Sequence, residues 1–176
     1  IGSRNNILDI GCGYGYLSLY LHYKNENRKI TGIDYDDEKI QLAENCYDKN
    51  ENISFTFADA RTFPFENQDV IFLNDVLHYL PKDNQQIFLD KCANALNENG
   101  IIFIRDGITD LTEKHKTTKL TEFMSTKLFK FNKKEGDFHF PSIDFVKSFA
   151  EKNKFDFEMK EHSQETSNVL FILRKP

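Results

Sequence analysis

The chain has 176 residues, of which 39% are hydrophobic and 29% are charged, a size and balance that favour one soluble domain with its own core. The formal net charge is −5, so no overall basic surface indicates a nucleic-acid partner. No apolar run reaches the roughly 18 residues of a membrane span. The three cysteines, Cys12, Cys46 and Cys92, are predicted to be buried free thiols in the reducing environment of the cytoplasm.

Short apolar runs alternate with helical patterns along the first hundred residues. Because these runs are apolar on both faces, the alternation predicts an α/β fold with a parallel sheet covered by helices on both sides. Five runs are predicted to be strands: 7–10, 30–33, 53–57, 70–73 and 101–104. Two later runs, FDFEMKEH and NVLFILR, have no helix between them and predict an antiparallel hairpin that completes the sheet.

The helical patterns follow the first, second and fourth runs, and one more precedes the hairpin. In the second helix, either Asp36 or Asp37 is expected to cap the N-terminus. Helical spacing places three side chains of this segment on one inward face: Ile40, Ala43 and Tyr47.

The helix after the fourth strand has its own start and stop signals. Pro81 and Asp83 are expected to open it, with Gln86 completing a capping box. Asn99 and Gly100 are expected to end it, because Asn–Gly favours a turn. The last helix, before the hairpin, is expected to bury four side chains: Phe145, Val146, Phe149 and Ala150.

Residues 107–140 interrupt the alternation. The segment holds seven lysines against five acidic residues, has a helix-like stretch over 119–128 and is rich in aromatic side chains. An insertion after the fifth strand lies at the carboxyl edge of the sheet, where open α/β folds bind ligands. Within a single domain over 1–176, we interpret 107–140 as a lid or substrate wall; a surface helix that only completes the fold is the alternative.

A glycine-rich turn, DIGCGYGYL, follows the first strand. Gly11, Gly13 and Gly15 give backbone freedom between a strand and a helix N-terminus, an arrangement that holds nucleotides. The dinucleotide fingerprint G-x-G-x-x-G requires a glycine at position 16, where the chain has Tyr16. Asp9, just before the glycines, suits a cationic group of the ligand better than a pyrophosphate.

Polar side chains also follow the next three strands. Asp34 can accept hydrogen bonds from both hydroxyls of a ribose, and Tyr35 beside it offers a flat face to adenine. Asp59 follows the third strand, in a position to accept the exocyclic amine of adenine. After the fourth strand come Asn74, Asp75 and His78. A nucleoside with a charged amino-acid tail fits these residues together.

The runs ILDIGCGYGYL, ITGIDYDDEKI, ISFTFADARTFPF, DVIFLNDVLHYL and LNENGIIFIRD resemble class I S-adenosylmethionine-dependent methyltransferases over most of residues 7–105. The resemblance implies a Rossmann-like seven-stranded sheet of order 3-2-1-4-5-7-6, with strand 7 antiparallel. It implies S-adenosyl-L-methionine as methyl donor and S-adenosyl-L-homocysteine as product.

Carried over by position, the resemblance assigns residues to each part of the donor. They are Asp9, Gly11, Cys12, Gly13 and Gly15 for the methionine-binding loop, Asp34 for the ribose, Tyr35, Asp59 and Ala60 for the adenine, and Asn74 beneath the methionine portion.

A narrower resemblance extends over residues 105–134, where general methyltransferases diverge. Stretches such as IRDGITDLTEKHKTTKLTEF are similar to the methyltransferase portion of long proteins that also carry an MMPL-type lipid exporter and a lysophospholipid acyltransferase segment. This resemblance implies a piece of a longer protein, tethered at the cytoplasmic face of a membrane.

A general base is needed only if the acceptor must lose a proton. The candidates are His78, His115, Asp75 and Asp106. A histidine at a helix start, bonded to a backbone carbonyl, is the alternative for His78, and a solvated helix face is the alternative for the lysine-rich surroundings of His115. Arg105 and Asp106 are expected to pair and shape the pocket floor. No set of residues indicates a metal.

The leading hypothesis is methyl transfer to a small-molecule or lipid-related acceptor. The alternatives are a binding module without turnover, which senses S-adenosylmethionine or serves a larger protein structurally, and a nicotinamide-dependent oxidoreductase, against which Tyr16 counts. The sequence predicts neither the acceptor atom nor the oligomeric state.

Overall fold

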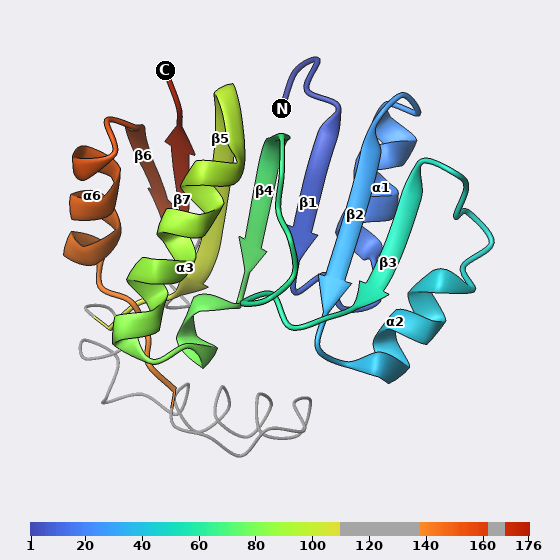
Figure 1. The fold of residues 1–176 in the computed structure, drawn as a ribbon, viewed down its shortest axis with the longest axis horizontal. Helices are drawn as coiled ribbons and strands as arrows, with labels where there is room; N and C mark the ends of the chain where they lie inside the picture. The colour runs from blue at the N-terminus through green and yellow to red at the C-terminus, as the bar shows by residue number, and fades with distance from the viewer. Residues whose placement is uncertain (110–137, 162–167) are drawn as a thin grey trace.

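The computed structural model describes residues 1–109, 138–161 and 168–176 (Figure 1). These residues form a seven-stranded sheet of order β3-β2-β1-β4-β5-β7-β6, which confirms the predicted topology. The first five strands are parallel, and β7 runs antiparallel to both β5 and β6. The strands are β1 (Asn6–Ile10), β2 (Lys29–Asp34), β3 (Ile53–Phe57), β4 (Gln68–Asn74), β5 (Leu96–Gly107), β6 (Asp156–Glu161) and β7 (Asn168–Arg174).

Helices cover both faces of this sheet, as the apolar strands require. They are α1 (Tyr16–Lys24), α2 (Asp37–Glu44), α3 (Lys82–Ala95), α6 (Ile143–Lys152) and the short 3₁₀ helix η1 (Leu77–Tyr79). Leu8 and Ile10 of β1 point into the cluster shared with α3 and α6, whereas Ile7 packs with Leu21 of α1. Successive side chains of a strand face opposite sides, so both layers are anchored to the same short strand.

The start of α2 is confirmed and its predicted inward face is partly wrong. Asp36 is the N-cap, and its side chain accepts a hydrogen bond from the backbone N–H of Lys39 at 3.3 Å. Ile40 and Ala43 are buried, but Tyr47 is 98% exposed. The helix ends at Glu44, so helical spacing no longer applies to Tyr47.

The predicted boundaries of α3 need two corrections. Pro81 is the N-cap and no side chain caps the helix, so the expected capping box is wrong: Gln86 donates instead to Asp90 at 3.1 Å. Asp83 lies in the first turn, where its negative charge interacts favourably with the helix dipole. The helix ends at Ala95 rather than at Asn99, because pairing with β4 draws the chain into β5 from Leu96 onwards.

The C-terminal elements agree with prediction. Ser142 caps α6 by accepting the backbone N–H of Phe145 at 3.1 Å, and the helix buries Val146, Phe149 and Ala150. Phe145 is half-buried at the edge of the same cluster. The hairpin is β6 and β7, and β7 inserts next to β5.

Several expectations fall outside the described residues: the helix-like stretch 119–128, most of the lid or wall 107–140, and His115 with the lysines around it. Within the described ranges the model has no helix that is both long and apolar enough to cross a membrane. The three cysteines are free thiols, of which Cys92 is buried while Cys12 and Cys46 are half-buried.

Candidate functional site at the carboxyl edge of the sheet

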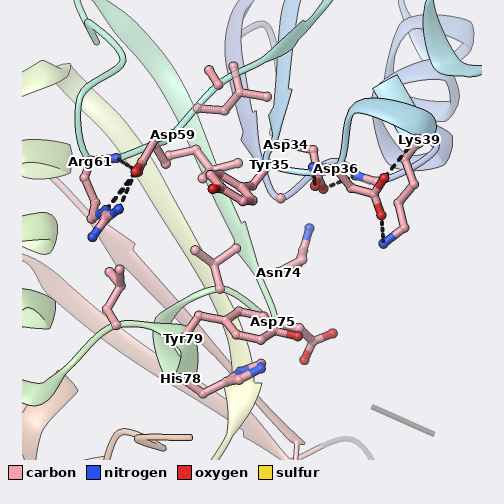
Figure 2. A pocket seen from close by; sticks show the side chains of 18 of the residues that line it. Asp34, Tyr35, Asp36, Lys39, Asp59, Arg61, Asn74, Asp75, His78 and Tyr79 are labelled. Atoms are coloured by element: carbon pink, nitrogen blue, oxygen red, sulfur yellow. Dashed lines mark hydrogen bonds and ion pairs between the residues drawn. The ribbon is translucent and has the colours of Figure 1, made fainter. Parts of the chain in front are cut away.

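A cavity of about 990 Å³ opens at the carboxyl ends of the parallel strands (Figure 2). Most of the predicted site residues line it: Gly11, Gly13, Asp34, Tyr35, Asp59, Ala60, Asn74, Asp75 and His78. Three more, Asp9, Cys12 and Gly15, lie behind this wall, and His115 is outside the described residues. The cavity has a glycine-loop side, lined by Gly11, Gly13, 34–39 and 57–61, and a histidine side, lined by 74–76, 78–80, Gly107, Phe140 and Asn168 and backed by the buried Asp106.

The three glycines of the loop serve different purposes, although all have positive φ (73°, 56° and 76°). A Cβ on Gly11 would lie 2.6 Å from the side chain of Val76, and one on Gly15 would lie 2.4 Å from the ring of Phe55. A Cβ on Gly13 would meet nothing within 4 Å. Packing therefore explains two glycines, whereas at Gly13 the bare backbone faces open space in the cavity wall.

Asp34 connects the tip of β2 to this loop. Its carboxylate accepts the backbone N–H of Gly13 at 2.8 Å and that of Asp36 at 2.9 Å. Each oxygen then holds one of these donors, and a carboxylate oxygen can accept a second hydrogen bond. In Figure 2, the side chain of Asn74 at the end of β4 points toward Asp34, and both residues line the cavity.

Asp9 lies under the loop and is only 1% exposed. Ser18 of α1 donates its hydroxyl to one carboxylate oxygen at 2.7 Å, while the other oxygen is buried and none of the described residues donates to it. Burial raises the pKa of Asp9 to about 6; the Ser18 hydrogen bond lowers it, and the nearby charge of Asp34 raises it further. The charged form of Asp9 is therefore costly in this structure.

The far end of the glycine-loop side is an aromatic and acidic edge. Tyr35 is 57% exposed, with its ring 5.9 Å from that of Phe57. Asp59 pairs with the guanidinium of Arg61. Lys91 of α3 donates to the backbone oxygens of Ala60 at 3.1 Å and Arg61 at 3.0 Å, and to that of Phe63, which holds this loop against the helix.

On the histidine side, the expected pairing of Arg105 with Asp106 is wrong. The two residues are neighbours on β5, and neighbouring side chains of a strand point to opposite faces of the sheet, so they point away from each other. Arg105 pairs with Asp75, whose backbone has a positive φ of 55° after the end of β4. Asp106 is fully buried and pairs with His78.

The His78 ring is 2% exposed and lies against the cavity. Its Nδ1 is 2.7 Å from Asp106 Oδ1, while its Nε2 is buried with no hydrogen-bond partner in the described part of the chain. The predicted alternative, a bond from the ring to a backbone carbonyl, is not what the structure has. It is the backbone oxygen of His78 that accepts a hydrogen bond, from the N–H of His139 at 2.8 Å.

Sequence reasoning missed part of the wall. Tyr79 and Phe140 line the histidine side, and Asn168 at the start of β7 lines it too. Phe140 belongs to a segment singled out for its aromatic residues, but nothing in the local sequence around Asn168 indicates a site. In the part of the chain that the structure describes, no group of three or more His, Cys, Asp or Glu side chains is arranged to hold a metal ion.

Comparisons with known proteins agree with the fold. The family described as "Methyltransferase domain" matches residues 7–100. The chain is 31% identical over 107 residues to the carboxy-S-adenosyl-L-methionine synthase of Shewanella amazonensis. The matched stretch covers 58% of this chain and 44% of that protein. It is 30% identical over 125 residues to the (S)-tetrahydroprotoberberine N-methyltransferase of Eschscholzia californica. This match covers 69% of this chain and 35% of that protein.

The chain thus spans less than half the length of these two relatives. Among solved structures, it is similar to the magnesium protoporphyrin IX methyltransferase of Synechocystis PCC 6803 with bound SAH. The TM-score is 0.71 at 14% identity, over 98% of this chain and 74% of that one. At that identity the likeness shows the fold.

Proposed function

The chain belongs to the methyltransferase domain family, and we propose that it binds S-adenosylmethionine in the cavity at the carboxyl edge of the sheet and transfers its methyl group to a small-molecule or lipid-related acceptor. The observation that carries the proposal is the bare backbone of Gly13 facing the cavity, hydrogen-bonded to the Asp34 carboxylate at 2.8 Å. Together they offer backbone without a Cβ beside a carboxylate whose oxygens can each accept one more hydrogen bond, as from a hydroxyl group.

The other assigned residues fit the same ligand. Asp34 would accept the ribose hydroxyls, Tyr35 would cover the adenine, and Asp59 with Ala60 would meet its edge. Asn74 and Asp9 would serve the methionine end, Asn74 from the wall and Asp9 from beneath the loop. Acidic side chains outnumber basic ones in the lining, which favours a ligand with a net positive charge.

The donor, when bound, supplies an already activated methyl group on a sulfonium. The residues of this chain then have to align the acceptor with that methyl group and exclude water, and alignment alone can be worth about 7–11 kcal/mol. On the histidine side, apolar and aromatic side chains form the wall that would do this: Val76, Tyr79, Leu80, Phe88 and Phe140. His78 is the candidate base in that wall, whereas the carboxylate of Asp75 is held by Arg105.

We extend the proposal to the segment 107–140 as part of the acceptor wall. Gly107 and Phe140, at its two ends, line the cavity. A Cβ on Gly107 would lie 2.9 Å from the ring of Phe140, so the two ends of the segment are closely packed. We place the reaction in the cytoplasm.

Calorimetry tests the proposed binding directly. S-adenosylhomocysteine is expected to bind the wild-type chain, and Asp34→Ala is expected to weaken binding by about 1.5–3 kcal/mol, the scale for losing a charged hydrogen-bond acceptor. Asp48→Ala, which removes an exposed acid beyond α2, is the matched control and should bind as the wild type does. Binding of NADH in place of S-adenosylhomocysteine would contradict the proposal, and equal affinity in Asp34→Ala would remove the ribose assignment.

The competing function is a module that binds S-adenosylmethionine without turnover, as a sensing or structural part of a larger protein. It predicts tight binding of the donor with no methyl release. Incubation of the full-length protein with S-adenosylmethionine labelled on the methyl group and a lipid extract from its own cells separates the two functions. A labelled lipid supports the transferase, and label retained only on the donor supports the binding module.

A further inference from the structure

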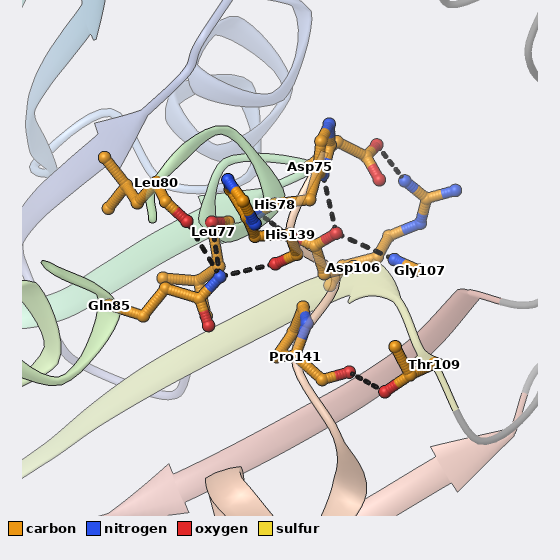
Figure 3. A network of polar contacts seen from close by, with 11 residues as sticks. Asp75, Leu77, His78, Leu80, Gln85, Asp106, Gly107, Thr109, His139 and Pro141 are labelled. Atoms are coloured by element: carbon orange, nitrogen blue, oxygen red, sulfur yellow. Dashed lines mark hydrogen bonds and ion pairs between the residues drawn. The ribbon is translucent and has the colours of Figure 1, made fainter. Parts of the chain in front are cut away.

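The pair of His78 and Asp106 is buried on the histidine side, where the two residues are 2% and 0% exposed (Figure 3). The two residues are 28 positions apart and meet because β4 and β5 are neighbours in the sheet. Asp106 faces three donors: Nδ1 of His78 at 2.7 Å, the backbone N–H of Gly107 at 2.8 Å and the backbone N–H of His78 at 3.3 Å.

These contacts fix the tautomer of His78. Both Asp106 oxygens already accept backbone N–H groups, so the carboxylate acts as an acceptor toward the ring as well. The hydrogen of the neutral ring is therefore assigned to Nδ1, and the lone pair to Nε2. This is the form in which a histidine can take a proton.

The Nε2 atom is buried and has no partner among the described residues. Leaving a buried acceptor unsatisfied destabilises the folded state, so such a group calls for an explanation. Because the ring lines the cavity, a ligand in the cavity can supply the missing donor. A hydroxyl group meets this need, since it donates one hydrogen and carries no charge into an apolar wall.

The surroundings hold the ring in place and keep the site apolar. The side-chain amide of Gln85, 2% exposed, donates to the backbone oxygens of Leu77 at 3.0 Å, Leu80 at 3.1 Å and His139. These hydrogen bonds join the segment that carries His78 to the segment that begins at residue 138. The ring centroids of Tyr79 and Phe140 are 4.1 Å and 5.2 Å from that of His78.

Among the described residues, the charged groups near the ring are Asp106 and the ion pair of Asp75 with Arg105, whose side chains are both about half-exposed. Tyr79 and His139 are the other titratable residues next to the pair, through ring contact and through the backbone respectively. A carboxylate acceptor would bring charge against the lone pair of Nε2 and has no proton to give. An ammonium acceptor would lose the water that solvates its charge when it binds against this apolar wall.

We propose that His78 is the general base for a hydroxyl group on an aromatic, apolar acceptor, and that Asp106 is the positioning residue that holds His78 in its basic tautomer. This rests on the proposed methyl transfer and names its substrate class. The hydroxyl proton passes to Nε2 while the acceptor oxygen forms its bond to the methyl carbon; the carbon–sulfur bond breaks, and its electron pair stays on sulfur. His78 becomes an imidazolium, which Asp106 stabilises, and later releases the proton to water.

Three probes that share a para-tert-butylphenyl group test the acceptor class: para-tert-butylphenol, para-tert-butylbenzylamine, which is an ammonium ion at neutral pH, and para-tert-butylbenzoic acid, each with methyl-labelled S-adenosylmethionine. The phenol is expected to be methylated at least tenfold faster than the other two. His78→Gln should lower kcat on the phenol by about 10²–10⁴-fold, the usual contribution of a general base. Affinity for S-adenosylhomocysteine should stay within threefold of wild type, which separates this proposal from the proposed function.

Asp106→Asn tests the positioning role. It should lower kcat by at least tenfold with KM within threefold, and should displace the acid limb of the pH–rate profile, an effect that a merely structural residue would not have. Asp106→Glu should recover part of the rate. Asp90→Asn, the same exchange on the outer face of α3, should behave as wild type.

The wild-type protein keeps the test decisive where a variant fails to fold. Its rate on the phenol, measured at saturating S-adenosylmethionine, should fall on acidification. The proposal is overturned if the benzylamine or the benzoic acid is the preferred probe, if the phenol is not methylated by a protein that binds S-adenosylhomocysteine, or if His78→Gln retains a rate within threefold of wild type. Absence of S-adenosylhomocysteine binding would instead reject the proposed function.

Discussion

The two sides of the cavity are built by different means. On the glycine-loop side, the backbone shapes the cavity: three glycines have positive φ angles, and Asp34 accepts hydrogen bonds from two backbone N–H groups. On the histidine side, buried side chains do it, through the pair of His78 with Asp106 and the amide of Gln85. The first side is rich in carboxylates, whereas the second is lined mainly by apolar and aromatic groups.

The difference corresponds to what each side would bind. A donor that every member of such a family shares can be held by backbone geometry, which tolerates change in most side chains. An acceptor that differs between enzymes must be recognised by side chains, which can be exchanged without disturbing the strands. The carboxyl edge of a parallel sheet serves both needs because the tips of adjacent strands meet there.

The largest expected effect separates two glycines on the glycine-loop side. Gly15→Ala is expected to lower the free energy of unfolding by about 4 kcal/mol, because left-handed strain and overpacking against Phe55 each cost about 1–3 kcal/mol. Gly13→Ala has the strain without the clash and should lose only about 1–2 kcal/mol. Urea denaturation of both variants measures the difference.

Binding should rank the same two variants in the opposite order. Relative to its folded fraction, Gly15→Ala should keep most of its affinity for S-adenosylhomocysteine. Gly13→Ala should lose at least tenfold, because its Cβ enters the open space where we place the donor. Equal losses of stability, or unchanged binding in Gly13→Ala, would show that the loop does not divide into a packed part and a ligand-facing part.

The next effect concerns the charge beneath the loop. The pKa of Asp9 is raised to about 6 in the folded chain from an ordinary value of 3.8, so the native state holds the proton more tightly than the unfolded state does. Its contribution to stability is fully present below pH 3.8 and is lost as the pH rises to about 6, a change of about 3 kcal/mol. The stability of Asp9→Asn relative to wild type should therefore increase as the pH rises from 3.8 to about 6, and the difference should be constant above pH 6.

Asp69 provides a control of opposite sign. It lies at the other end of the sheet and accepts the backbone N–H groups of Asn5 and Asn6, both at 3.0 Å. Although partial burial opposes the shift, these bonds and that from Asn97 lower the pKa of Asp69. Asp69→Asn should thus be less stable than wild type at neutral pH, and the deficit should shrink as the pH falls below 3.8. A pH-independent difference for Asp9→Asn would mean that Asp9 carries no buried charge.

The sequence allowed most of the glycine-loop side to be predicted. Strands, strand order and the loop follow from apolar runs and from glycine and acid spacing, all of which are local signals. The family assignment is confirmed by the match over residues 7–100. The assignment of single residues to parts of the donor stays a prediction. The errors there are at element ends: α2 stops before Tyr47, and α3 gives way to β5 at Leu96.

The histidine side was predicted only as a set of separate candidates. His78 and Asp106 were each named, but Asp106 was paired with its neighbour Arg105, against the alternation of side chains along a strand. Their actual contact depends on the register in which Asn74 lies opposite Arg105 in adjacent strands. Gln85 and His139 are 54 residues apart, and no local pattern connects them. Long-range side-chain pairs of this kind have no signal in a single sequence.

The smallest expected effect concerns the residue that connects α3 to the glycine-loop side. Lys91 donates to the backbone oxygens of Ala60, Arg61 and Phe63, and its ammonium lies 3.9 Å from the centre of the Phe65 ring. Lys91→Met keeps an apolar stem against Phe65 and removes the three donors. A partly exposed hydrogen bond is worth about 1 kcal/mol net, so affinity for S-adenosylhomocysteine should fall by about threefold to tenfold.

Lys82→Met, at the exposed start of the same helix, is the control and should bind as the wild type does. If the two sides are independent, Lys91→Met should leave the KM for the phenol and the acid limb of the pH–rate profile unchanged, since the pair of His78 and Asp106 is held by other contacts. A change in either would mean that α3 transmits strain from the adenine edge to the base. The cavity would then be one cooperative unit rather than two sides built by different means.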